Sequence, residues 1–134
     1  MNRSRVPAAN LIILTASLDL GLLQQRVLEY EGFGVIVPAS REEAFQQLAS
    51  QSFDVAVVSH SLDREDAAAL VKRFRLRNPH GRVLAITLSG AAPTAFRVDE
   101  TVAGLEGPEK LVQAIRELLN SRPAQATGAP VPEA

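Results

Sequence analysis

The sequence contains no cysteine and no tryptophan, and aromatic residues make up only 4% of its 134 residues. Without cysteine, disulfide scaffolds, thiolate metal sites and cysteine nucleophiles are excluded. So few aromatic rings argue against a surface on which bases or sugars stack. The two histidines, His60 and His80, are too few for a histidine-based metal cluster. The available chemistry is therefore that of hydroxyl, carboxylate and basic side chains.

Charge of one sign is not in excess either, because 14 Lys and Arg residues stand against 15 Asp and Glu, a formal net charge of -1. This balance argues against a basic nucleic-acid binder and against a polyanion mimic, so no nucleic-acid partner is expected. One local stretch is basic, with no acid among Lys72, Arg73, Arg75, Arg77 and Arg82. It could meet an acidic partner or a phosphate backbone, but a solvated helix face whose cations complement a helix C-terminus explains it more simply.

Long hydrophobic runs are also missing. Arg3 and Arg5 precede an apolar run at 11–14, but four residues are too short for the core of a signal peptide. No run approaches the roughly 18 apolar residues of a membrane span. We therefore expect a cytoplasmic protein with no membrane partner.

What the sequence does contain is an alternation of short apolar runs with amphipathic segments. The runs at 11–14, 35–37, 55–58 and 83–86 are continuously apolar, and a weaker fifth run lies at 101–103. Such runs are typical of strands buried on both faces of a parallel sheet. The alternation predicts an α/β fold, a doubly wound five-stranded parallel sheet with helices on both faces.

The first predicted helix lies between Ser17, which fits an N-cap, and Gly32, which fits the position just beyond a helix end. It extends to about Tyr30. Its apolar residues have helical spacing, and we expect them to form one buried face: Leu18, Leu22, Leu23, Val27 and Leu28.

Three further helices have recognisable starts. Ser40 and Glu43 form a capping box that opens the second. Asp63 can cap the third, which the turn residues 78–81 end. Pro108 suits the first turn of the last helix, which ends near Asn120. We expect residues 10–120 to form one domain, preceded by a flexible N-terminus at 1–9 and followed by a disordered Pro- and Ala-rich tail at 121–134.

In the order and spacing of five stretches, the chain resembles the receiver domain of two-component response regulators over roughly residues 10–120. The resemblance implies a flavodoxin-like (βα)5 sheet of strand order 2-1-3-4-5, with its chemistry at the carboxyl ends of the strands. The stretch from Thr87 to Gly104 is short for a receiver, so we expect the fourth helix to be shortened or replaced by a loop at 90–93. The five stretches are Leu28–Val35, Glu42–Phe45, Phe53–Val58, Arg82–Thr87 and Pro108–Leu111.

Receivers accept a phosphoryl group from a kinase histidine on an aspartate at the end of the third strand. Two acids after the first strand hold Mg²⁺, and a hydroxyl after the fourth strand and a lysine after the fifth contact the phosphoryl oxygens. Here the phosphoacceptor position falls on Ser59, the acid pair on Thr15 and Ala16, and the lysine on Gly104. Thr87 retains the hydroxyl. The chain thus resembles a degenerate receiver, or pseudo-receiver, that lacks the phosphoacceptor aspartate.

Other chemistry at these positions finds little support. A Ser59 nucleophile needs a base, but its neighbour His60 should point to the opposite face of an extended chain, so a triad with Asp63 is rejected. Asp19 is the only acid close after the first strand, and it fits the first turn of a helix, where it stabilises the helix end. Asp54 precedes the third strand and should lie at the opposite edge of the sheet. No metal site and no cofactor are predicted.

The leading hypothesis is a non-catalytic, receiver-like signalling domain that acts by protein–protein interaction in a two-component or phosphorelay-type pathway of a bacterium. Its expected partner is a histidine kinase, another regulator or an output protein, bound at the last strand, the loop 88–101 and the last helix. A homodimer through the last strand and last helix is also expected. The alternative is an atypical receiver with phosphoryl or small-ligand chemistry at Ser59 and Thr87, or with Asp19 in an altered role.

Overall fold

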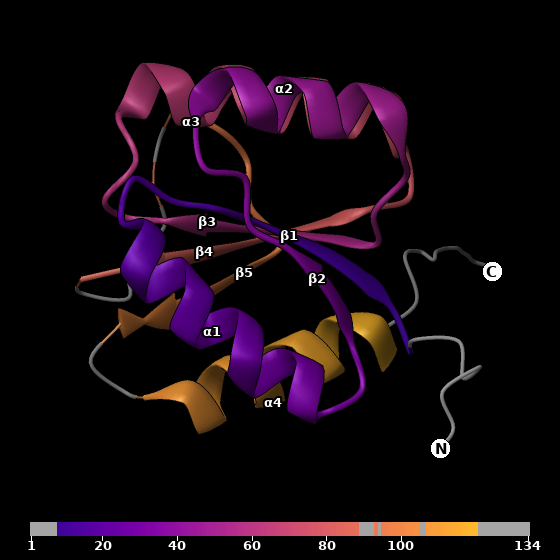
Figure 1. The fold of residues 1–134 in the computed structure, drawn as a ribbon, viewed down its shortest axis with the longest axis vertical. Coiled ribbons are helices and arrows are strands. Elements are labelled where there is room, and N and C mark those ends of the chain that lie inside the picture. The colour runs from indigo at the N-terminus through magenta and orange to yellow at the C-terminus, as the bar shows by residue number, and fades with distance from the viewer. Residues whose placement is uncertain (1–7, 89–92, 94, 105–106, 121–134) are drawn as a thin grey trace, which may run out of the picture.

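The computed structural model describes residues 8–88, 93, 95–104 and 107–120. Five parallel strands form one sheet of order β2-β1-β3-β4-β5, the flavodoxin-like order that the resemblance implies (Figure 1). The strands are β1 (Asn10–Leu14), β2 (Gly34–Ile36), β3 (Val55–Ser59), β4 (Arg82–Thr87) and β5 (Glu100–Ala103). The helices are α1 (Leu18–Tyr30), α2 (Arg41–Ser50), α3 (Arg64–Arg77) and α4 (Pro108–Asn120).

The strands form where apolar residues run without interruption, because the sheet is covered on both faces. Every residue of β3 is buried, and β1 is buried from Leu11 to Leu14. Strand β2 begins and ends one residue earlier than predicted. Val37 lies beyond its end but still packs against the core. The fifth and weakest predicted strand is present as β5 and pairs with β4.

The helix starts follow the predicted capping. Ser17 accepts a hydrogen bond from the Leu20 amide, and Ser40 accepts one from the Glu43 amide. Asp63 accepts from the amides of Glu65 and Asp66, two of the amide groups that a helix N-terminus leaves without an internal partner.

The helices cover the two faces in pairs, α1 with α4 on one face and α2 with α3 on the other (Figure 1). Each face has its own hydrophobic cluster, because successive strand residues point to opposite sides. In β1, for example, Leu11 and Ile13 join the cluster beneath α1 and α4, whereas Ile12 and Leu14 join the one beneath α2 and α3.

The buried face of α1 differs from the prediction. Gly21 and Leu28 are the residues of this helix that are buried, whereas Leu18, Leu22 and Leu23 are 39%, 42% and 61% exposed. The cause is the close approach of the helix to the sheet at Gly21, where a Cβ atom would lie 2.8 Å from Cγ1 of Val37. Only a glycine permits that distance, and it turns the leucines outward.

No described residue between β4 and β5 is helical, so the fourth helix of the resemblance is missing in the described part of this segment. Phe96 and Val98 pack against the cluster of the α2 and α3 face instead. Arg75 of α3 donates to the carbonyl of Arg97 at 2.7 Å and lies 3.5 Å from the carboxylate of Asp99. Burial lowers the pKa of Arg75, and the nearby Asp99 carboxylate acts in the opposite direction.

The folded chain includes two residues of the expected N-terminal lead. The Ala8 amide donates to the Gly32 carbonyl, and the Ala9 carbonyl accepts from the Gly34 amide. Gly32 has the positive φ, 99°, that its predicted position requires. The rest of the lead (1–7), the tail at 121–134 and most of the loop 90–93 lie outside the described residues. Within the described residues, no helix is both long and apolar enough to cross a bilayer.

Candidate functional site

The candidate site lies at the carboxyl edge of the sheet, where a doubly wound fold places its ligands. Thr15 follows β1, Ser59 ends β3, Thr87 ends β4 and Gly104 follows β5. The strands are parallel and in register, with Leu14 paired to Val58 and Ser59 paired to Ile86. Positions far apart in the sequence therefore meet at one edge.

Three hydroxyl side chains connect two of these strand ends, and we call Thr15, Ser59 and Ser61 the hydroxyl cluster. Oγ of Ser61 lies 3.0 Å from Oγ of Ser59 and 3.1 Å from Oγ1 of Thr15. It also accepts a hydrogen bond from the Ala16 amide at 3.1 Å. Ser61 thus joins the β3–α3 loop to the β1–α1 loop.

The hydrogen bonds of the cluster can all be made at once if the hydroxyls donate in one direction. Ser59 donates to Ser61, Ser61 donates to Thr15, and Thr15 donates to the Ser17 carbonyl. Each oxygen then still has a lone pair for its backbone donor, because Ser59 accepts from the Ser61 amide and Thr15 from the Ser17 amide. The cluster is a closed, neutral network with each oxygen partnered.

The nearby carboxylates do not join this cluster. Asp19 lies exposed in the first turn of α1, and Asp63 is engaged as the cap of α3. Asp54 accepts from the Asn10 amide at the opposite edge, as predicted. Among the described residues, no three acidic or histidine side chains come together as metal ligands would. A Mg²⁺ ion prefers carboxylate oxygens, so the hydroxyls and the Ala16 methyl do not fit it.

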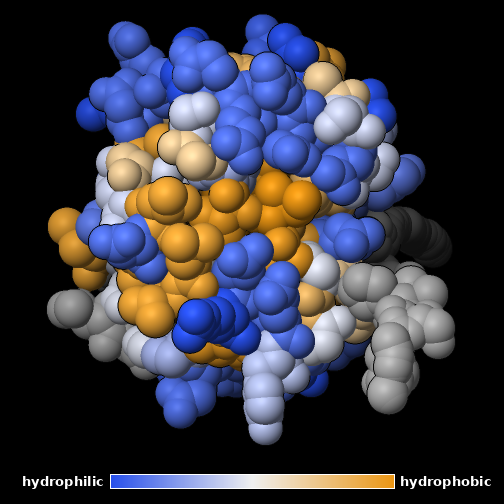
Figure 2. Space-filling model, in the orientation of Figure 1, coloured by the Kyte–Doolittle hydropathy of each residue, from blue (hydrophilic) through white to orange (hydrophobic). Residues whose placement is uncertain are grey.

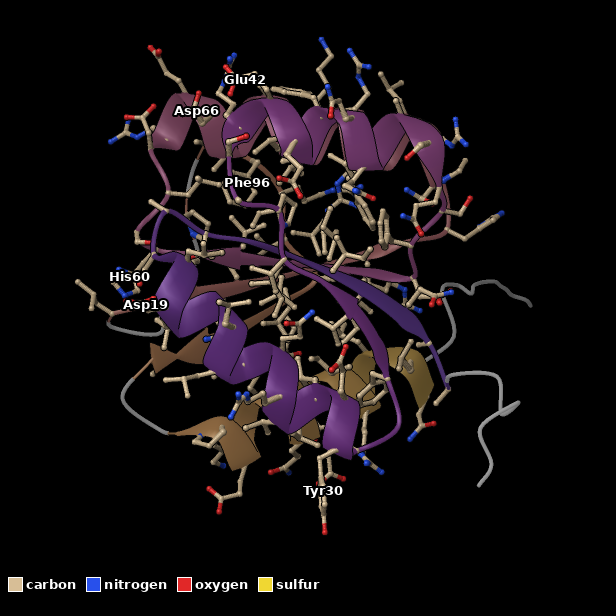
Figure 3. The ribbon with its side chains drawn as sticks, viewed as in Figure 1. Asp19, Tyr30, Glu42, His60, Asp66 and Phe96 are labelled. Atoms are coloured by element: carbon tan, nitrogen blue, oxygen red, sulfur yellow. The ribbon has the colours of Figure 1, made fainter. Side chains whose placement is uncertain are left out.

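His60 lies beside Ser59 in sequence, yet Ser59 is buried and His60 is exposed. Figure 3 shows His60 and Asp19 at the same end of the sheet, although the two form no ion pair. The Ser59 hydroxyl is hydrogen-bonded within the cluster rather than to the imidazole. The arrangement therefore provides Ser59 with no general base.

Thr87 makes no hydrogen bond to the cluster and lies, like Ser59, beside a cavity of about 370 Å³. Its Oγ1 atom is buried and has no hydrogen-bond partner within the described structure. Ser59, His60, Arg64 and Phe96 are among the other residues that line the cavity. An unpaired hydroxyl beside polar and cationic neighbours is the polar feature that a small bound molecule could use.

Gly104 stands at the position expected for the lysine, and its surroundings do not require glycine. A Cβ atom there would lie 3.4 Å from Cγ2 of Ile86 and 3.6 Å from the Thr87 carbonyl oxygen, which is ordinary contact. A Cβ atom is therefore sterically tolerated at this position.

Sequence reasoning missed two residues of this region. Ser61 organises the cluster, and the signal for it was a second hydroxyl two residues after Ser59, at the turn that follows β3. Phe96 packs against the cluster of the α2 and α3 face from the non-helical residues described before β5, and no local pattern marked it.

Similarity to known proteins is found at the level of structure. No protein-family model matches the sequence, and no curated protein matches it. A CheY-like receiver domain from Methanospirillum hungatei JF-1 has a TM-score of 0.70 at 19% identity, with 83% of this chain and 93% of that chain covered. Chemotaxis protein CheY4 of Vibrio cholerae has a TM-score of 0.71 at 18% identity, with 82% and 98% covered.

A response regulator from Thermotoga maritima is similar to the same degree, with a TM-score of 0.69 at 19% identity and 87% and 100% of the two chains covered. These similarities establish that the chain has the CheY-like fold.

Proposed function

We propose that this chain is a non-catalytic, receiver-like signalling domain that acts by binding other proteins in a two-component or phosphorelay-type pathway and is not phosphorylated on aspartate. The observation that supports this most is the hydroxyl cluster of Thr15, Ser59 and Ser61, which occupies the carboxyl edge of a CheY-like sheet. The proposed setting is the cytoplasm of a bacterium, without a cofactor.

Phosphoryl transfer to a receiver needs a carboxylate nucleophile and a cation to offset the charge that gathers on the phosphoryl group. The cluster supplies neither, because its members are neutral hydroxyls that are hydrogen-bonded to one another and to backbone groups. Gly104 adds no positive charge at the end of β5. The three cluster positions and Gly104 therefore supply none of the charged groups that the reaction uses, which supports the proposal.

The proposed docking face consists of β5, the segment 88–101 and α4, and its partner is a histidine kinase, another regulator or an output protein. Helix α4 buries Leu111, Ala114, Ile115 and Leu118 and presents a polar outer face. Its Lys110 is exposed, and its Arg116 is paired with Glu31 of α1 at 2.6 Å. A mixed polar face of this kind suits a reversible partner.

The test is incubation of the protein with a small phosphodonor and Mg²⁺, followed by intact-mass analysis at acidic and neutral pH. We expect no added phosphate, whereas an intact receiver treated in parallel should gain one acid-labile group. A stable acid-labile phosphoprotein would overturn the proposal.

A matched pair of variants identifies the missing groups. Ser59→Asp restores the nucleophile position alone, and we expect it to remain unmodified because positions 15 and 16 still hold no carboxylate for Mg²⁺. Adding Thr15→Asp and Ala16→Asp to it restores the acid set, and this variant should gain phosphate if the missing carboxylates are the cause.

The unpaired Thr87 hydroxyl and its cavity favour a second candidate, an atypical receiver with phosphoryl or small-ligand chemistry at Ser59 and Thr87. A ligand that binds the folded state raises the unfolding temperature, so a thermal-shift screen of nucleotides and small anions tests it. The Thr87→Val variant is the matched control, since it removes the hydroxyl at nearly constant volume. An acid-stable phosphate on Ser59 in protein purified from its host would also support this candidate.

A further inference from the structure

The outer face of α1 is more apolar than a solvated helix requires. Leu22 and Leu23 are 42% and 61% exposed in the middle of the helix, and Leu18 and Leu20 are about as exposed as Leu22. Figure 2 shows hydrophobic surface over the first half of α1, continuing into the space between α1 and α2. Contiguous apolar surface of this kind marks an interaction site on a soluble protein.

The helix cannot bury these leucines by rotating on its own sheet. Gly21 faces inward, and a Cβ atom there would lie 2.8 Å from Cγ1 of Val37 and 2.9 Å from Cγ2 of Thr15. Leu28 is fully buried about two turns further along the same face. Any bulkier residue brought to the Gly21 position would collide with the side chains of Val37 and Thr15, so rotation of the helix does not bury the leucines and they remain available to a partner molecule.

The charges on this face indicate which partner fits. With about 3.6 residues per turn, positions 19, 22, 23, 26 and 30 fall along one outward stripe. Asp19 lies three residues before Leu22, and Arg26 lies three residues after Leu23. In the described part of the chain, neither Asp19 nor Arg26 belongs to one of the ion pairs.

This stripe is complementary to itself when it runs antiparallel. A two-fold axis between Leu22 and Leu23 places these leucines against their counterparts in a second copy. It also places each Asp19 opposite the Arg26 of the other copy. Self-complementarity about a two-fold axis is the defining property of an isologous interface.

We propose that a second copy of this chain docks on α1, in a symmetric dimer whose two α1 helices pack antiparallel. The proposal goes beyond the function proposed above and does not depend on it. It uses the outward face of α1, which borders the β5 and α4 face along a groove lined by Leu20 and Leu23. One 13-residue helix offers less area than the roughly 800 Å² per partner of a standard interface, so the dimer should be weak and concentration-dependent.

The test is sedimentation equilibrium of the full chain over a wide concentration range, with charge-swap variants. Asp19→Arg and Arg26→Asp each replace two attractive contacts with two repulsive ones, and each should weaken dimerisation by about tenfold. The double variant Asp19→Arg/Arg26→Asp restores opposite charges across the axis and should regain the dimer. Leu23→Ser should weaken it as well.

Lys110→Glu on α4 is the matched control, because it reverses an exposed charge on the other candidate dimer face. It should leave dimerisation unchanged. All substituted side chains are exposed, and circular dichroism confirms that each variant is folded. A chain that stays monomeric, a dimer insensitive to the single swaps, or a folded double variant that fails to recover would overturn the proposal. The first result would instead favour a different protein as the occupant of the leucines.

Discussion

Ser61 organises the hydroxyl cluster at the carboxyl edge of the sheet, although Ser59 holds the position expected for a phosphoacceptor. Its Oγ contacts two hydroxyls and one backbone amide on a separate loop. Ser61→Ala removes these contacts, and we expect a loss of about 1 kcal/mol in the free energy of unfolding, since water can reach this exposed residue and replaces part of the bonding. Urea denaturation measures the change.

Ser52→Ala is the control for that measurement, because Ser52 is exposed and its side chain makes no hydrogen bond within the described structure. Its unfolding midpoint should match the wild type. Equal midpoints for Ser61→Ala and Ser52→Ala would show that the hydroxyl cluster contributes nothing to stability.

Asn78 shows a role that its sequence context hides. It sits among turn residues, yet its side chain is buried and joins two backbone segments. Oδ1 accepts from the Phe53 amide, and Nδ2 donates to the Phe74 carbonyl, both at 3.0 Å. Turn chemistry was predictable from the neighbouring Pro and Gly, but the contact to residue 53 was not, because it depends on how α3 packs beside β3.

Asn78→Ala leaves the buried Phe53 amide without its partner, and such a group is costly to bury unpaired, whereas the Phe74 carbonyl still accepts from the backbone amide of residue 78. We expect the free energy of unfolding to fall by about 2 kcal/mol, as measured by urea denaturation. Asn120→Ala changes an exposed Asn at the end of α4 and should have little effect. An unchanged free energy of unfolding for Asn78→Ala would contradict the role of this side chain in joining the two backbone segments.

At the scale of the elements, the strands and helix starts were predictable, because each depends on local sequence. Continuous apolar runs and capping residues such as Ser40 and Asp63 act within a few residues. The buried face of α1 was predicted wrongly. Its leucines have helical spacing on more than one side of the helix, so spacing alone does not show which side is buried. The buried side is determined by the close approach of Gly21 to Val37, two residues in separate parts of the fold.

The described residues between β4 and β5 are non-helical, and a few contacts anchor them to the core. Phe96 is half-buried and packs against the core, so Phe96→Ala should reduce the free energy of unfolding by about 1–2 kcal/mol, less than the loss expected for a fully buried ring. Arg97→Ala removes only an exposed side chain next to it and should fall within about 0.5 kcal/mol of the wild type. The thermal and urea unfolding midpoints of the two variants should therefore differ clearly. Equal midpoints would refute the anchoring role of Phe96.

At the scale of the whole molecule, the parallel sheet is what brings the site together. Positions 15, 59, 87 and 104 converge because each follows or ends a strand of the same direction. Their convergence was predictable from strand order. The hydrogen bonds of the cluster were not, because they depend on how the β3–α3 turn bends toward β1.

The strands of the sheet differ in burial, and their backbone amides should therefore differ in protection from hydrogen exchange. Strand β3 lies in the centre and is buried throughout, whereas β5 is an edge strand with one buried residue, Val102. We expect amide hydrogen exchange to be slowest in β1, β3 and β4 and faster in β5, because local opening at an edge breaks fewer contacts. Equal protection of β3 and β5 would show that the sheet opens only as one unit.

The neutrality of the hydroxyl cluster also bears on how the protein responds to its surroundings. Carboxylates gathered at one edge repel each other, and a fold that carries them depends on protonation or divalent cations to relieve that repulsion. Thr15, Ser59 and Ser61 hold no charge to relieve. The hydrogen bonds among these three hydroxyls should therefore contribute the same stability from mildly acidic to mildly basic solution, with or without Mg²⁺.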